Sequence, residues 1–136
     1  MLTQKLTKTI EVLDRLIELT TKDIQNIKLA KHEEVFANIQ TKEKLAYEFS
    51  KLKSEVDQIL VARNKPIEEI FSPQEEELFN IFREKLLQFH KLHKHFSKLS
   101  LSVANFYNAL LSQIKQSDTI NYKNESFIAS KLQLKA

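Results

Sequence analysis

The apolar side chains between Ser72 and Ser117 fall on a single helical stripe. Successive members are three or four residues apart, which places them on one face of an α-helix. The members of the stripe are Leu78, Phe82, Leu86, Phe89, Leu92, Phe96, Leu99, Val103, Phe106, Leu110 and Ile114. The pattern predicts one α-helix over residues 73–117. At 1.5 Å per residue such a helix would be about 67 Å long, so we expect an elongated protein with this helix as its spine.

The start of this helix carries a capping signal. Ser72 can accept a hydrogen bond from a first-turn amide, Pro73 needs no amide partner, and Glu75 can return a bond to the amide of Ser72. Glu75, Glu76 and Glu77 lie where the helix dipole favours negative charge. We therefore interpret these carboxylates as solvated and dipole-compensating, not as an acid–base pair.

Two earlier segments repeat the helical spacing. Residues 3–29 and residues 33–63 are each predicted to be a helix, because their apolar side chains recur every three or four positions. The stripe loses its apolar members near Ala30, Lys31 and His32, but no glycine or proline marks the joint. A single kinked helix over residues 3–63 therefore stays an alternative. Asn64 to Ser72, with Pro66 and Pro73, is predicted to be a turn.

These segments predict an all-α fold. We expect an elongated antiparallel helical bundle, or coiled-coil hairpin, in which the second and third helices pair. The first helix or the tail would fill a third position. Residues 1–117 would form the bundle, and residues 118–136 a mobile polar tail with a possible short helix. The apolar residues of that short helix would be Phe127, Ile128, Leu132 and Leu134.

The amino-acid composition agrees with an all-helical fold and also bears on where in the cell the protein is located. The 136 residues include no glycine, two prolines and no cysteine. Tight hairpin turns therefore lack their usual residues, and disulfides and thiolate metal sites are excluded. No apolar run reaches the length of about 18 residues that a membrane span needs, and the first residues lack the apolar core of a secretory signal. We expect a cytoplasmic protein with no membrane insertion.

The only cluster with metal-ligand character is His90, His93 and His95. His90 and His93 share a helical face, but no carboxylate or thiolate completes a site, and Lys91 and Lys94 would repel a cation. We interpret the cluster as a solvated basic face. No phosphate-binding loop, paired-histidine zinc motif or nucleophile motif is present. The sequence therefore predicts no enzyme, no metal and no cofactor.

A basic stretch raises nucleic-acid binding as an alternative. Five lysines and arginines and three histidines lie between Arg83 and Lys98. The net charge of the chain is only +3, however, and no aromatic residues are arranged to stack on bases. Basic residues on a long helix usually serve solubility, so we expect no nucleic-acid partner.

The order of the segments resembles that of a known family. The first two helices read LDRLIELTTKDIQNIKLAKHEEVFANIQTKEKLAYEFSKLKSEVDQIL, and the long helix contains HFSKLSLSVANFYNALLSQI, followed by a tail with INYKN. A first amphipathic helix, a break, a lysine-rich second helix, a long third helix and a polar tail follow in turn. This layout resembles the FlgN-type flagellar export chaperones over most of the chain.

The resemblance implies a non-enzymatic carrier. Members of that family hold hook–filament junction proteins by a helical C-terminal segment and escort them to the export gate. The candidate substrate-binding residues lie beyond the reach of the second helix: Val103, Phe106, Tyr107, Leu110 and Ile114. Core packing against the first helix or the tail is the alternative for them. By the resemblance, Ile120 and Tyr122 would dock the export-gate component, unless the tail folds back onto the bundle.

Two other functions fit the same stripes. The first is a coiled-coil scaffold or adaptor with no secretion role, which could be a homodimer. The second is a helix that binds a membrane surface, and only the short apolar set in the tail supports it.

Overall fold

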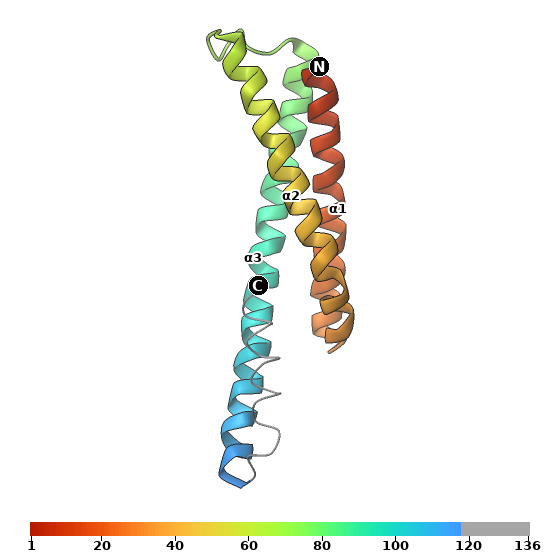
Figure 1. The fold of residues 1–136 in the computed structure, drawn as a ribbon, viewed down its shortest axis with the longest axis vertical. Coiled ribbons are helices and arrows are strands. Elements are labelled where there is room, and N and C mark those ends of the chain that lie inside the picture. Colours follow the sequence, from red (N-terminus) through yellow and green to blue (C-terminus); the bar gives the residue numbers. More distant parts are fainter. Residues whose placement is uncertain (118–136) are drawn as a thin grey trace.

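Three α-helices make up the described part of the chain. The structure is a computed structural model that describes the backbone of residues 1–117 and the side chains of residues 1–113. The helices are α1 (Leu2–Lys28), α2 (His32–Arg63) and α3 (Pro73–Ser117). They run down, up and down along one long axis (Figure 1). Residues 1–117 contain no strand, so the predicted all-α fold is confirmed.

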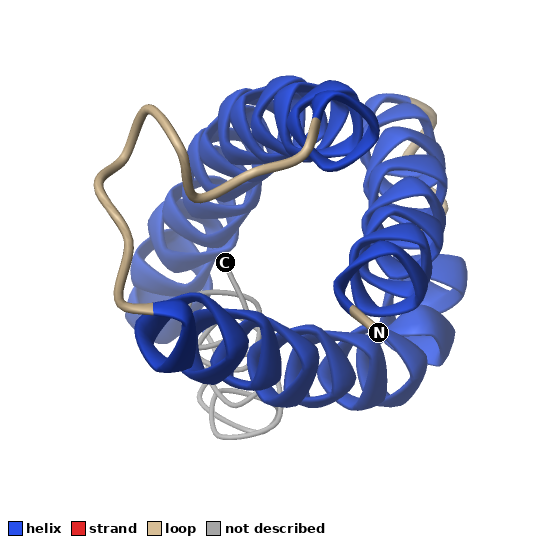
Figure 2. Ribbon diagram, turned by 90° about the horizontal axis from the view of Figure 1, so that it is seen from above, coloured by secondary structure: helices blue, strands red, loops and turns tan. Residues whose placement is uncertain are grey.

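The helix at the centre of the packing is α1, not α3 as the sequence suggested. α1 packs closely against both α2 and α3, whereas α2 and α3 do not pair closely with each other. Seen from the end, the three helices lie around a common axis (Figure 2). α1 supplies the deepest apolar side chains, among them Leu6, Leu13 and Leu16. The predicted pairing of the second and third helices is therefore wrong. α1 is the shortest of the three helices and lies between two longer ones, so it buries most of its apolar stripe.

The core is divided into three clusters along the axis. One lies near the α2–α3 loop around Leu6 and Val56, and a middle one around Leu16 and Leu45. The third lies near the α1–α2 turn and includes Ile27. α2 and α3 still meet through long side chains, as in the stacked rings of Phe49 and Phe82, whose centroids are 6.2 Å apart.

The joint between α1 and α2 is a true break, so the kinked single helix is excluded. Ala30 adopts a left-handed conformation with φ 60°. Its amide donates to the carbonyl of Ile27 at 3.0 Å, and the amide of Lys31 donates to that of Asn26 at 2.7 Å. These two bonds form a Schellman motif, which ends a helix by satisfying its last carbonyls.

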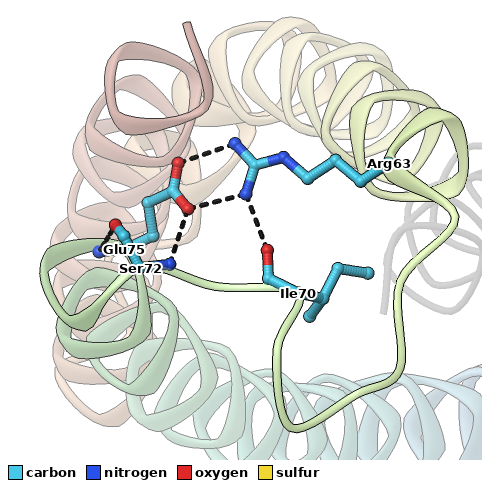
Figure 3. A network of polar contacts seen from close by, with 4 residues as sticks. All are labelled: Arg63, Ile70, Ser72 and Glu75. Carbon is cyan, nitrogen blue, oxygen red and sulfur yellow. Dashed lines mark hydrogen bonds and ion pairs between the residues drawn. The ribbon is translucent and has the colours of Figure 1, made fainter.

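The loop between α2 and α3 is held by a polar network (Figure 3). Asn64 ends α2 in a left-handed conformation. The Glu75 amide donates to Ser72 Oγ at 3.3 Å, and the Ser72 amide donates to Glu75 Oε1 at 2.9 Å. The predicted capping box is therefore confirmed.

Arg63 joins this network from the end of α2. Its guanidinium donates to both carboxylate oxygens of Glu75, at 2.6 and 2.7 Å, and to the carbonyl of Ile70 at 2.7 Å (Figure 3). We call Arg63, Ile70, Ser72 and Glu75 the loop clasp. The Arg63 hydrogen bonds and the Ser72 amide lower the pKa of Glu75 to about 2.

α3 extends past the α1–α2 turn. In Figure 1 its last turns lie below the end of the α1–α2 pair. None of the described helices combines the length and apolar character that crossing a membrane requires.

Candidate functional site

An apolar hollow lies where the α1–α2 turn meets α3. It has a volume of about 410 Å³. The turn contributes Ile27, Lys28, Ala30 and His32, and α3 contributes Leu99, Ser102, Val103, Phe106 and Tyr107. We call these nine residues the turn hollow. It exists because the Schellman motif ends α1 here while α3 continues.

One stripe of α3 passes from the core into this hollow and beyond it. Leu99 and Val103 pack against the core cluster that contains Ile27. Phe106 and Leu110 are the next members at helical spacing, and they are 62% and 37% exposed. The same stripe of α3 therefore packs in the core before the helix passes the α1–α2 turn. Beyond the turn it continues as accessible apolar surface.

Near the α1–α2 turn, the buried face of α3 runs one position later than the predicted stripe. Ser100, Ala104 and Leu111 are buried, whereas the predicted stripe passes through Leu99, Val103 and Leu110. In this part of α3 the predicted stripe lies at the edge of the packed face, although its earlier members Phe82 and Phe96 are buried. This offset explains why its members near the turn remain accessible.

Tyr107 forms one wall of the hollow. Its ring meets that of His32 edge to face at a centroid distance of 6.0 Å, and it lies 6.0 Å from the ring of Phe106. Among the described residues, the buried His32 Nδ1 has no hydrogen-bond partner. The hollow thus has aromatic walls and mostly apolar neighbours, an arrangement suited to binding an apolar segment.

The structure brings together only some of the predicted site residues. Val103, Phe106 and Tyr107 line the turn hollow, and Leu110 lies one turn further along α3. The side chain of Ile114 and the tail residues Ile120 and Tyr122 lie outside the described residues. The contribution of the α1–α2 turn was missed by the sequence analysis. The available signal was the loss of the apolar stripe near Ala30, which marks where α1 stops covering α3.

The three histidines of the cluster are exposed, and one of their rings packs beside apolar neighbours. His90, His93 and His95 are all exposed, and the ring centroid of His93 lies 5.8 Å from that of Phe89 and 6.5 Å from that of Phe96. Burial lowers the pKa of His93, and the positive charges of Lys42 and His90 lower it further. The exposure of all three side chains agrees with the predicted solvated face, although the His93 ring also packs beside two phenylalanines. Within residues 1–117, no three histidine, aspartate or glutamate side chains are grouped so that they could hold a metal ion.

A buried ion pair lies in the same region and was also missed. The Asp23 carboxylate accepts from Lys42 Nζ at 3.0 Å and from Asn38 Nδ2 at 2.9 Å. Lys42 Nζ also lies 4.0 Å from the ring centroid of Phe96. Because Asp23 is buried, this pairing compensates a charge that would otherwise be costly. The pair links α1 to α2.

Comparison with known proteins returns no relative. No protein-family model matches the chain, and neither a curated protein nor a solved structure matches it. The function is therefore inferred from the geometry of the turn hollow and from the layout of the sequence.

Proposed function

We propose that this chain is a non-enzymatic carrier that binds an amphipathic helix of another protein along the C-terminal part of α3. One observation carries the proposal: the stripe that packs against α1 through Leu99 and Val103 continues as exposed Phe106 and Leu110. Anchors at steps of three or four residues are the pattern with which a groove accepts a helix.

The energetics of the surface support this role. Covering the exposed parts of Phe106 and Leu110 would contribute on the order of 2 kcal/mol. The hollow beside them offers the space for a large apolar side chain of the partner, and Tyr107 and His32 supply its aromatic wall. A bound helix would lie in the place that α1 occupies higher up, next to the same stripe of α3.

The partner that fits the sequence layout is a flagellar export substrate. By its resemblance to FlgN-type chaperones, the chain would bind the C-terminal helical segment of a hook–filament junction protein in the cytoplasm. It would then present the complex to the export gate through Ile120 and Tyr122. The turn hollow supports the first step, and the resemblance alone supports the second.

A self-associating scaffold is the second candidate. Leu87 and Leu101 are 60% and 47% exposed. They lie fourteen positions apart on α3, two heptads, so they share one face of the helix. This pair lies on a different face from Phe106, since positions five residues apart differ by about 140° around a helix. The two functions can therefore be separated by mutation.

The test compares Phe106→Asp with Leu101→Asp in the full chain. Both side chains are exposed, so we expect both variants to keep their helix content by circular dichroism. In a calorimetric titration with C-terminal segments of the junction proteins from the same cell, Phe106→Asp should weaken binding at least tenfold. Leu101→Asp should bind as the wild type does.

Other outcomes would contradict the carrier. If the wild type does not bind the junction segments, or if Phe106→Asp binds as tightly as wild type, the proposed site is wrong. If light scattering shows a dimer that only Leu101→Asp dissociates, and no junction segment binds, the scaffold replaces the carrier.

A further inference from the structure

A second cavity lies in the middle of the bundle, between α2 and α3, with α1 as its floor. Its volume is about 170 Å³. Leu16 comes from α1, Val35 from α2, and Phe89 and Phe96 from α3. It is separate from the turn hollow and shares no residue with it. We call it the interhelix cavity. It forms where α2 and α3 do not pack closely against each other.

The walls of the interhelix cavity favour a flat apolar ligand. The rings of Phe89, His93 and Phe96 follow one another along α3, tilted by about 30° between neighbours. Aromatic ligands gain from offset or edge contacts with such rings beyond the area they bury. An apolar cavity of about 150 Å³ is large enough to hold benzene, so the interhelix cavity accommodates a single ring.

The charges at the cavity wall favour a neutral ligand. Asp23, Lys42 and Glu43 line the cavity; Asp23 and Lys42 are paired with each other at 3.0 Å, and Glu43 is exposed to solvent. Asn38 satisfies the other carboxylate oxygen of Asp23. A charged ligand would lose its hydration without an unpaired counter-charge at this pair. Partial burial also lowers the pKa of His93, which favours its neutral imidazole.

One polar atom in the wall has no partner. Ser100 lines the cavity and is fully buried, and its hydroxyl makes no hydrogen bond to any residue of the described chain. A buried hydroxyl without a partner is costly, and a ligand that can bond to it recovers that cost. The unpaired Ser100 hydroxyl therefore favours a ligand with one hydrogen-bonding group.

From these observations we propose that the interhelix cavity binds a small neutral aromatic alcohol of the phenol class. The ring lies among Phe89, His93 and Phe96, and the hydroxyl of the ligand bonds to Ser100 Oγ. The ligand enters from the α2 side, where the exposed Ala46 forms part of the rim. The proposal does not depend on the carrier function, because the turn hollow takes no part in it.

The experiment titrates phenol and benzene into the isotopically labelled full chain and follows amide shifts by NMR. We expect both to shift the amides of the cavity wall, with a phenol Kd on the order of 1 mM, since so small a ligand makes few contacts. Phenol should bind more tightly than benzene. Phe106→Asp should bind phenol as the wild type does.

Two variants locate the site. Ser100→Ala removes only a hydroxyl, so the fold and the benzene affinity should be kept while phenol affinity falls about tenfold, the worth of one hydrogen bond. Ala46→Phe should block the rim and abolish both ligands. The proposal is overturned if phenol causes no shifts at the wall, or if Ser100→Ala leaves the ratio of phenol to benzene affinity unchanged. That second result would mean that water satisfies Ser100.

Discussion

The two joints between the helices share a left-handed residue but differ in the side-chain bonds around it. Each helix ends with a residue in the left-handed region, Ala30 after α1 and Asn64 in the α2–α3 loop. At the second joint the loop clasp follows, with side-chain bonds from Arg63 and a capping box at the start of α3. At the first joint only backbone bonds close the turn, and α2 begins without a side-chain cap.

This difference gives the bundle two unlike ends. We call the end with the α2–α3 loop the fastened end and the end with the α1–α2 turn the accessible end. At the α2–α3 loop, charged hydrogen bonds fix the loop and the core cluster around Leu6 lies close behind it. At the α1–α2 turn, little but backbone geometry defines the joint, and apolar side chains of α3 remain exposed beside it. Binding surfaces are expected at such an end, because the scaffold holds them in place without covering them.

The largest expected effect compares core residues from the two ends. Leu6 is fully buried near the loop, whereas Val103 is only half-buried near the turn. We expect Leu6→Ala to lower the free energy of unfolding by about 3 kcal/mol through lost contacts and a cavity. Val103→Ala should cost about 1 kcal/mol, since less surface returns to water. Urea denaturation followed by circular dichroism measures both, and equal losses would contradict the contrast between the ends.

The sequence predicted the fastened end well, because its signals are local. Ser72, Pro73 and Glu75 form a capping motif that depends only on neighbouring residues, and the structure confirms it. The helices also begin and end within one residue of the predicted ranges. Arg63 was not foreseen as a partner of Glu75, because their pairing depends on how the loop folds back.

The accessible end was less predictable, because its features depend on tertiary packing. Ala30 has no intrinsic preference for the left-handed region, so nothing in its identity marks the end of α1. The central place of α1 was missed because amphipathic stripes show that a helix packs but do not say against which partner. The buried ion pair of Asp23 was not foreseen, because its partners Asn38 and Lys42 belong to another helix.

The next expected effect concerns the loop clasp. Glu75→Gln keeps the shape of the side chain but removes the charge that binds Arg63, so we expect a loss of about 2 kcal/mol in the free energy of unfolding. Glu76→Gln is the matched control, because Glu76 is also in the first turn of α3 but is exposed. The Glu76→Gln variant should lose only about 0.5 kcal/mol of the free energy of unfolding, which is the contribution of a charge near the helix dipole. Similar losses for both would show that the clasp adds little to the fastened end.

The same pair predicts a pH dependence with a defined sign. The pKa of Glu75 is lowered from 4.5 to about 2. A carboxyl whose pKa is lowered on folding contributes stability above its unfolded pKa and loses it as the pH falls through the folded value. The stability difference between wild type and Glu75→Gln should therefore be full above pH 4.5 and shrink towards pH 2. A difference that stays constant over this window would exclude the charged pairing.

The smallest expected effect tests the turn at the accessible end. A left-handed conformation costs a non-glycine residue about 1–2 kcal/mol, and glycine avoids that cost while its unfolded chain gains about 0.4–1 kcal/mol of entropy. Ala30→Gly should therefore stabilise the protein by about 0.5–1 kcal/mol. Asn64→Gly should change stability by less than about 0.5 kcal/mol, since asparagine tolerates this conformation.

The control for this change is the same substitution inside a helix. Ala37 is exposed in α2, and Ala37→Gly should destabilise the protein by about 1 kcal/mol because glycine is a poor helix former. Opposite signs at Ala30 and Ala37, measured from urea midpoints, would show that α1 ends in a strained residue. A loss at both positions would mean that residues 2–63 behave as one continuous helix in solution. In that case the turn hollow would lose the wall that α1 and its turn provide.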